Sequence, residues 1–196
     1  MAEAEPPSFD PTILPSDGSC PFCTIAQTYP PFPPQHPPAA SAPELDPSKI
    51  TPPSFVVLST PTLMAFLDIM PLSPGHLLLC PRAHRPKLSD VSRDEAAELG
   101  LYLRLLSKAL SRTTGVYDWN VVQNNGAAAA QVVNHVHYHL IPRPEIRAKG
   151  KFRESFTMFG RGQREDLDDD EAVALAAKLR ANIAAVLDEE SRKAKL

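Results

Sequence analysis

The sequence has 196 residues, a formal net charge of −3 at pH 7 and a hydrophobic fraction of 43%. This length suits one domain of ordinary size with appended tails, and the apolar fraction is sufficient for a buried core. An acidic chain lacks the basic surface of a nucleic-acid-binding protein, and no run approaches the roughly 18 apolar residues of a membrane span. We therefore expect neither nucleic acid nor a membrane among its partners.

The amino terminus and the cysteines indicate the cellular compartment in which the protein is located. The first ten residues, MAEAEPPSFD, are acidic and proline-rich and lack the cationic and apolar regions of a signal peptide. Only three cysteines occur, two of them as Cys20-x-x-Cys23, so a disulfide scaffold is not indicated. These features predict an intracellular protein, located in the cytoplasm, the nucleus or both.

Proline is unevenly distributed along the chain. There are 22 prolines, about twice the usual share, and 15 of them lie in residues 1–53. Residues 1–18 are expected to form a flexible tail. Residues 28–54 lack helical or strand periodicity and predict an extended, semi-rigid linker that buries little surface. The alternative is a ligand for a proline-recognising partner domain.

Three strands are predicted after the proline-rich segment. Residues 55–59, 63–69 and 76–80 are short apolar runs separated by turn residues. Because they follow one another closely, an antiparallel meander is expected. A helix is then predicted from Ser92 to Gly115, since Ser92-x-x-Glu95 has capping-box spacing and leucines recur with the helical period.

The second half of the domain repeats this order. Residues 118–123 and 134–141 predict two strands around a loop of small residues, 124–130. Residues 144–196 are expected to form a basic loop and a carboxy-terminal helix, from Asp168 to about residue 190, that packs on the domain. Strands and helices do not alternate as βαβ units, so the fold class is α+β with an antiparallel sheet.

Three of the six histidines lie at alternate positions, His135, His137 and His139. Alternate residues of a strand share one face, so the three imidazoles would point the same way, about 6.6 Å apart. A solvated face does not require histidine. Imidazole is a good nucleophile and proton carrier near neutral pH, and the pattern therefore favours chemistry over a plain sheet surface.

This pattern resembles the signature of the histidine triad (HIT) superfamily of nucleotide hydrolases and transferases. Four further segments are similar to family motifs, in the same order: Phe66-Leu67-Asp68-Ile69-Met70-Pro71, Pro74-Gly75-His76, Pro81-Arg82-Ala83-His84, and Asn124-Asn125-Gly126 followed by Gln131. The resemblance covers residues 19–143. It implies a HIT fold, with an antiparallel five-stranded sheet, a long central helix and a carboxy-terminal helix, usually assembled as a homodimer.

The resemblance also implies a catalytic role for individual residues. His137 would attack the α-phosphate and form a covalent nucleotidyl-imidazole, from which water releases the nucleoside monophosphate. His139 and Asn124 would hold phosphate oxygens, with Gln131 close by. Asp68 would accept hydrogen bonds from the ribose hydroxyls. The apolar slot for the base would consist of Phe22, Ile25, Phe66 and Ile69.

The cysteine pair alone could be a redox pair, half of a zinc site or core packing. Zinc-containing members of the family carry a similar Cys-x-x-Cys together with two histidines. Carried over to this chain, the resemblance implies structural Zn²⁺ bound by Cys20, Cys23, His84 and His135, a tetrahedral Cys₂His₂ set. A metal-free site with free thiols is one alternative, and a triad that itself binds zinc through three histidines is another.

The sequence also departs from the family pattern. The Hint and Fhit branches carry Ser or Thr after the glutamine, where this chain has Val132. His139 is intact, which disfavours the transferase branch. His76 resembles a histidine common in the Hint branch, without a role that the sequence assigns.

We expect a Hint-like hydrolase of purine nucleoside 5′-phosphoramidates. The alternatives are a Fhit-like dinucleoside polyphosphate hydrolase and a weakly catalytic nucleotide-binding scaffold that recruits partners through residues 28–54.

Overall fold

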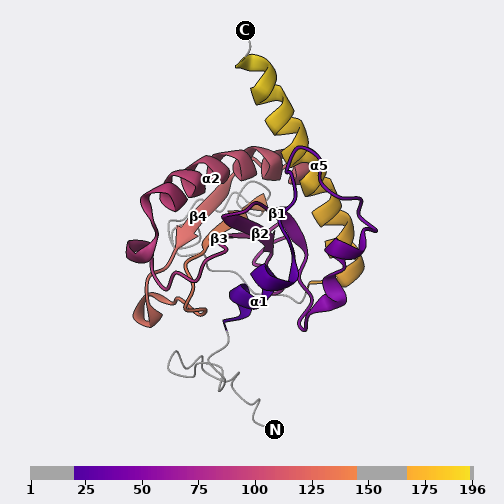
Figure 1. Ribbon diagram of the computed structural model, residues 1–196. Coiled ribbons are helices and arrows are strands. Elements are labelled where there is room, and N and C mark those ends of the chain that lie inside the picture. The colour runs from indigo at the N-terminus through magenta and orange to yellow at the C-terminus, as the bar shows by residue number, and fades with distance from the viewer. Residues whose placement is uncertain (1–19, 145–166, 195–196) are drawn as a thin grey trace.

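The structure is a computed structural model that describes residues 20–144 and 167–194 (Figure 1). Its centre is a five-stranded antiparallel sheet in the order β1-β2-β3-β5-β4. The strands are β1 (Val56–Ser59), β2 (Leu63–Leu67), β3 (Leu77–Pro81), β4 (Trp119–Gln123) and β5 (Tyr138–Pro142). The helices are α1 (Pro21–Thr28), α2 (Arg93–Thr114) and α5 (Asp169–Lys193).

Both faces of the sheet are covered, and the side chains of β2 show how. Leu63, Ala65 and Leu67 join the core formed with α2 and α5. Met64 and Phe66 point to the opposite face, where they pack with α1. Since alternate residues of a strand point to opposite faces, every side chain of this apolar strand is buried. The α+β class and the antiparallel meander are confirmed.

The long helix α2 has the ends that the sequence predicted. The Ser92 hydroxyl accepts a hydrogen bond from the Glu95 backbone at 3.2 Å, and the Glu95 carboxylate accepts one from the Ser92 backbone at 2.8 Å. This reciprocal pair satisfies amide groups that have no partner inside the helix. At the other end Gly115 has φ +69°, a left-handed conformation that glycine adopts without strain.

Helix α5 packs against α2 and β1. It buries Leu179, Ile183 and Val186, and the Arg180 guanidinium donates to the Val56 carbonyl at 2.7 Å. The Asp168 side chain caps its first turn by accepting from the Glu171 backbone. The predicted carboxy-terminal helix is therefore confirmed.

Two segments near the site differ from the sequence-based expectation. The strand expected over residues 134–141 begins only at Tyr138, because the Val136 backbone donates to the Arg85 carbonyl at 2.6 Å instead of extending the sheet ladder. Residues 21–28, for which no helix was predicted, form α1. A proline at the first position and a short apolar face account for this helix, and the face packs on the sheet.

Most residues of the proline-rich segment are exposed or half-buried, and Tyr29 and Leu45 anchor the segment to the domain. Tyr29 is only 1% exposed and Leu45 only 7%. The Tyr29 hydroxyl lies 3.0 Å from the Asp46 carbonyl oxygen, and the Phe32 backbone donates to the Ser59 carbonyl at 2.8 Å. The buried aromatic and aliphatic side chains anchor a segment whose prolines have little surface to bury.

The tail expected for residues 1–18 and most of the basic loop lie outside the described residues. Within residues 20–144 and 167–194, none of the helices combines the length and the apolar character needed to cross a bilayer.

The turn before β3 gives a test of the packing between sheet and helix. Gly75 has φ +89°, and a Cβ at this position would lie 2.9 Å from Thr114 Cγ2 at the end of α2. We expect Gly75→Ala to lower the free energy of unfolding by about 1–3 kcal/mol, from backbone strain and overpacking together. Chemical denaturation measures this difference.

Gly100→Ala is the matched control. Gly100 lies inside α2, and nothing lies within 4 Å of a Cβ built there. Alanine at this position should raise the free energy of unfolding by about 0.5–1 kcal/mol, because it restricts the unfolded chain and favours helix. Equal effects of the two substitutions would contradict the packing described for Gly75.

Candidate functional site

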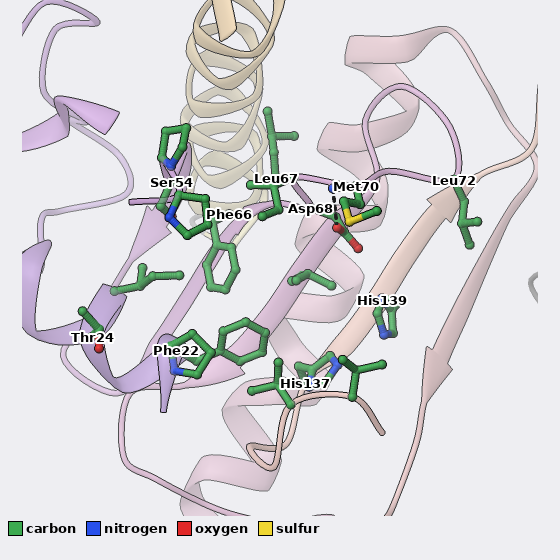
Figure 2. Close-up of a pocket in the computed structure, with 18 of the residues that line it drawn as sticks. Phe22, Thr24, Ser54, Phe66, Leu67, Asp68, Met70, Leu72, His137 and His139 are labelled. Carbon is green, nitrogen blue, oxygen red and sulfur yellow. Dashed lines mark hydrogen bonds between the residues drawn. The ribbon is translucent and has the colours of Figure 1, made fainter. Parts of the chain in front are cut away.

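A cavity of about 880 Å³ lies on the α1 face of the sheet (Figure 2). Its walls come from α1, from residues 50–54, from β2 and the turn after it, from β4 and the loop that follows, and from β5. The cavity therefore joins segments from both ends of the domain. Apart from its prolines, nothing in the sequence indicated that the segment 50–54 would line a cavity.

The four apolar residues expected to form a base slot all line this cavity. Phe22, Ile25 and Phe66 are buried, and Ile69 is 37% exposed. The Phe22 and Phe66 rings meet edge to face with centroids 5.2 Å apart, a favourable aromatic geometry. A flat, apolar ligand group can be accommodated beside this pair.

His137 is held in one orientation by its own segment. Its Nδ1 lies 2.6 Å from the His135 carbonyl oxygen, so Nδ1 carries the hydrogen and Nε2 keeps the lone pair in the neutral ring. Burial lowers the pKa of His137, which keeps the ring neutral at physiological pH. The His139 ring lies 4.8 Å away, and both rings line the cavity (Figure 2).

Asp68, His76 and His139 form a chain of polar contacts along the cavity wall. The Asp68 Oδ1 atom accepts a hydrogen bond from the Met70 backbone at 2.9 Å, and Oδ2 lies 3.5 Å from His76 Nδ1. The other nitrogen of His76, Nε2, lies 2.9 Å from His139 Nδ1. His76 is thus a residue of the site to which the sequence assigned no role, although the Pro-Gly-His motif pointed to it.

The polar residues of the loop after β4 divide into two groups. Asn124 lines the cavity, and its amide donates to the Ala130 carbonyl at 3.3 Å. Gln131 does not belong to the cavity lining. Its Oε1 accepts from the Gly126 backbone at 2.6 Å and its Nε2 donates to the Pro86 carbonyl at 2.7 Å, so the side chain braces the loop. Val132, 59% exposed, lines the cavity.

Cys20, Cys23, His84 and His135 lie together beside the cavity, with potential ligand atoms all within 4.8 Å of one another. Cys20 Sγ is 3.4 Å from His135 Nδ1, and Cys23 Sγ is 3.4 Å from His84 Nδ1. These two thiols and two imidazoles can hold a metal ion.

The His135 ring has the protonation and orientation that a metal ligand needs. Its Nε2 donates to the Pro81 carbonyl at 2.9 Å, so the Nδ1 lone pair faces the two sulfur atoms. Metal-ligating histidines commonly use the second nitrogen in this way. Burial lowers the pKa of His135 to about 4, which keeps the ring neutral, and burial raises the pKa of the Cys23 thiol to about 11.

A metal site made from the three triad histidines is excluded by this arrangement. The His135 side chain belongs to the cysteine group, while the Nδ1 atom of His137 is bonded to a carbonyl. Among the described residues, the other cluster able to hold a metal is Asp68, His76 and His139, and His137 belongs to neither cluster.

Arg82 fixes α1 to the sheet. Its guanidinium donates to the Tyr29 carbonyl at 3.1 Å and to the Ser59 hydroxyl at 2.8 Å, and it also contacts the Ala26 carbonyl. Ala26 lies in the last turn of α1 and Tyr29 is the residue that caps it, so both carbonyls are acceptors without a partner inside the helix. Helix α1, which carries Phe22 and Cys23, is therefore anchored at its carboxy-terminal end.

Comparisons with known proteins agree with this geometry. The family model described as HIT domain matches residues 50–146. The chain is 34% identical over 143 residues to the adenosine 5′-monophosphoramidase HNT1 of Candida albicans, which covers 70% of this chain and 88% of that protein. It is 39% identical over 92 residues to the adenosine 5′-monophosphoramidase hnt1 of Schizosaccharomyces pombe, which covers 47% of this chain and 66% of that protein.

Solved structures share the fold. A Zn-bound histidine triad family protein from Mycobacterium smegmatis superimposes with a TM-score of 0.58 at 25% identity, over 88% of this chain and 97% of that chain. The expected HIT fold is confirmed by the sheet order, the two long helices and this likeness. The family-model match and the relatives agree with the motifs around His137, and the chain belongs to the histidine triad (HIT) family.

Proposed function

We propose that this protein is a nucleotidyl hydrolase that cleaves purine nucleoside 5′-phosphoramidates to the nucleoside monophosphate and an amine. One observation carries the proposal. The neutral His137 ring is held through Nδ1 by the His135 carbonyl and presents Nε2 in a cavity that also contains an aromatic slot and a carboxylate. The names of the two fungal relatives, adenosine 5′-monophosphoramidases, agree with this substrate class.

The reaction proceeds in two displacements. In the first, the Nε2 lone pair of His137 forms a bond to the α-phosphorus while the bond from phosphorus to the amine nitrogen breaks, and the departing nitrogen takes one proton from solvent and leaves as the amine. In the second, water attacks the same phosphorus and gives one proton back to solvent, the bond to Nε2 breaks and the nucleoside monophosphate is released. A covalent intermediate replaces one difficult step by two easier ones.

Other residues of the cavity bind the remaining parts of the substrate. His139 and Asn124 donate to the non-bridging phosphate oxygens, where negative charge grows as the new bond forms. Asp68 accepts from the ribose hydroxyls. The base lies in the slot formed by Phe22, Ile25, Phe66 and Ile69. Gln131 acts indirectly, by holding the loop that carries Asn124.

The names of the two fungal relatives favour an amine over a polyphosphate as the leaving group. None of the described residues that line the cavity is lysine or arginine, and the lining includes the apolar side chains of Val122, Val132 and Ile141. A polyphosphate carries several negative charges, which enzymes generally neutralise with arginine, lysine or a metal ion. An amine leaving group makes no such demand.

The central test is substitution of the proposed nucleophile. We expect His137→Asn to lower the release of adenosine monophosphate from adenosine 5′-phosphoramidate by more than about 10³-fold, because no covalent intermediate can form. Mass spectrometry of the wild type mixed rapidly with substrate should detect a nucleotidyl adduct. The wild type should also cleave the phosphoramidate with a kcat/KM at least about tenfold above that for a diadenosine polyphosphate.

His36→Asn is the matched control, since His36 is exposed in the proline-rich segment and should be inert. Wild-type turnover in His137→Asn would refute the mechanism. Tight binding of adenosine monophosphate by a wild type that turns over neither substrate would support the scaffold alternative. Recruitment of a partner by residues 28–54 stays a prediction, as does a cytoplasmic or nuclear location.

We further propose that the metal bound by Cys20, Cys23, His84 and His135 is structural zinc. Two sulfur and two imidazole ligands are a closed tetrahedral set of the kind zinc prefers, with no position left for substrate. The Zn-bound relative from Mycobacterium smegmatis supports the choice of metal. When bound, zinc would link α1 to the segment before β5 and supply a cross-link rather than chemistry.

Zinc analysis of purified variants tests this assignment. We expect about one zinc per wild-type chain and a large loss of zinc, together with a lower Tm, in Cys23→Ala, because a three-ligand site binds zinc much more weakly. Cys80→Ala is the control, because Cys80 is buried in the core next to Cys20 but is not one of the four candidate ligands, so its loss should leave the zinc content unchanged. Retention of a full equivalent of zinc in Cys23→Ala would rule out the assignment.

A homodimer is the proposed assembly. Strand β4 lies at the edge of the sheet, and Trp119 and Val121 on this strand are exposed, as is the nearby Tyr117. An exposed edge strand with apolar side chains is suited to pairing with a second sheet. Sedimentation should give about twice the 21.4 kDa of one chain, and Val121→Lys should shift the protein to monomer. A monomeric wild type would contradict the proposal.

A further inference from the structure

We propose that His76 couples recognition of the ribose at Asp68 to the phosphate-binding function of His139, so that the ribose hydroxyls raise turnover as well as affinity. The proposal rests on the hydrolase function above and adds to it a positioning residue and a reason for specificity toward ribonucleosides. Its basis is the set of contacts that His76 makes with both residues from its fixed place directly before β3.

The backbone around His76 is rigidly placed. Its amide donates to the Ser73 carbonyl at 3.1 Å, and its own carbonyl accepts from the Asp68 amide at 2.9 Å. Gly75, directly before it, packs against the end of α2 with no room for a side chain. His76 is 1% exposed, so its ring is confined between Asp68 and His139.

The hydrogen bond from the Leu72 backbone favours one arrangement of the ring protons. The Leu72 backbone donates to His76 Nδ1 at 3.2 Å, so the proton of a neutral His76 is on Nε2. That proton is donated to His139 Nδ1 at 2.9 Å. A neutral His139 then carries its own proton on Nε2, where it can be donated to a phosphate oxygen.

A second arrangement of the same protons competes with the first. If the proton of His76 moves to Nδ1, the ring donates to Asp68 Oδ2, now 3.5 Å away, and Nε2 becomes an acceptor. His139 then places its proton on Nδ1 to donate to His76, and its Nε2 becomes a lone pair that repels a phosphate oxygen. Each ring keeps one proton in both arrangements, and solvent exchange interconverts them.

Binding of the ribose hydroxyls would change the relative populations of these two proton arrangements. Hydroxyls that donate to Asp68 reduce the negative potential of the carboxylate beside His76 Nδ1, and in a buried site this change is weakly screened. The Asp68 carboxylate then attracts a proton on His76 Nδ1 less strongly, so the arrangement with the proton between His76 and Asp68 becomes less stable. The arrangement that gives His139 a donor for the phosphate is favoured, and a substrate without ribose hydroxyls would leave the two in competition.

Glutamine and asparagine at position 76 each keep a polar group at only one of the two ring-nitrogen positions of His76. Glutamine reaches as far as the outer nitrogen of the ring and can donate to His139, but it cannot change tautomer. Asparagine stays near Leu72 and Asp68 and does not reach His139. The two variants therefore separate donation to His139 from its dependence on the ribose, and thermal unfolding checks that both are folded.

Steady-state kinetics compare adenosine 5′-phosphoramidate with its 2′,3′-dideoxy analogue. In the wild type, loss of the hydroxyls should raise KM and lower kcat by about tenfold. In His76→Gln most of the kcat for the ribose substrate should be retained, and the two substrates should differ in kcat by less than about twofold while the difference in KM remains. His76→Asn should have a low kcat with both substrates. A full tenfold kcat difference in His76→Gln would overturn the proposal.

A direct measurement separates this proposal from the hydrolase function. The ¹⁵N chemical shifts of His139 in the wild type should show the proton on Nε2 when adenosine monophosphate is bound, and a mixture of tautomers with the dideoxy monophosphate. The same tautomer with both ligands would overturn the coupling, even in an active enzyme. The expected difference in a protein without turnover would support the coupling while the hydrolase function failed.

Discussion

The hydrogen bond from His137 Nδ1 to the His135 carbonyl is the contact on which the site depends. It keeps the Nε2 lone pair of His137 available and fixes the direction in which that lone pair points. The same residue, His135, turns its side chain toward Cys20 and Cys23. One residue thus supplies a carbonyl to the proposed nucleophile and an imidazole to the proposed metal, so the position of the metal group and the orientation of the nucleophile are set together.

Helix α1 strengthens this connection from the other side. Phe22 lies between the two cysteines in sequence, and its ring contacts both His135 and His137, with centroids 5.7 and 5.1 Å apart. Arg82 holds the far end of the helix. The segment that carries two of the four candidate metal ligands therefore also forms one wall of the cavity. Detachment of α1 would remove the aromatic slot and expose His137 at the same moment.

Much of the fold could be predicted because its signals are local. The capping box of Ser92 and Glu95 and the apolar runs of β1 to β3 need only their immediate neighbours in sequence. The triad was recognisable from the alternation of histidines in the sequence, although only His139 lies within a strand and His135 points toward the cysteines instead of sharing a face with the other two. The HIT motifs then implied which distant segments meet.

The features that could not be predicted depend on contacts between distant segments. Strand β5 is short because the Val136 amide pairs with Arg85, about 50 residues away in sequence. Gln131 braces its loop rather than facing the cavity, because the Gly126 amide and the Pro86 carbonyl occupy its side chain. The anchoring of the proline-rich segment by Tyr29 and Leu45 likewise follows from three-dimensional packing, which composition does not reveal.

The wall formed by residues 50–54 has a consequence for how this scaffold can diversify. It belongs to an irregular loop outside the sheet, whereas the proposed catalytic and binding residues Asp68, His76, His137 and His139 lie on or beside β2, β3 and β5. Insertions and deletions in surface loops are tolerated far better than changes in strands. The end of the cavity near this loop can therefore be reshaped for new ligands over evolutionary time, while the machinery for phosphorus chemistry stays untouched.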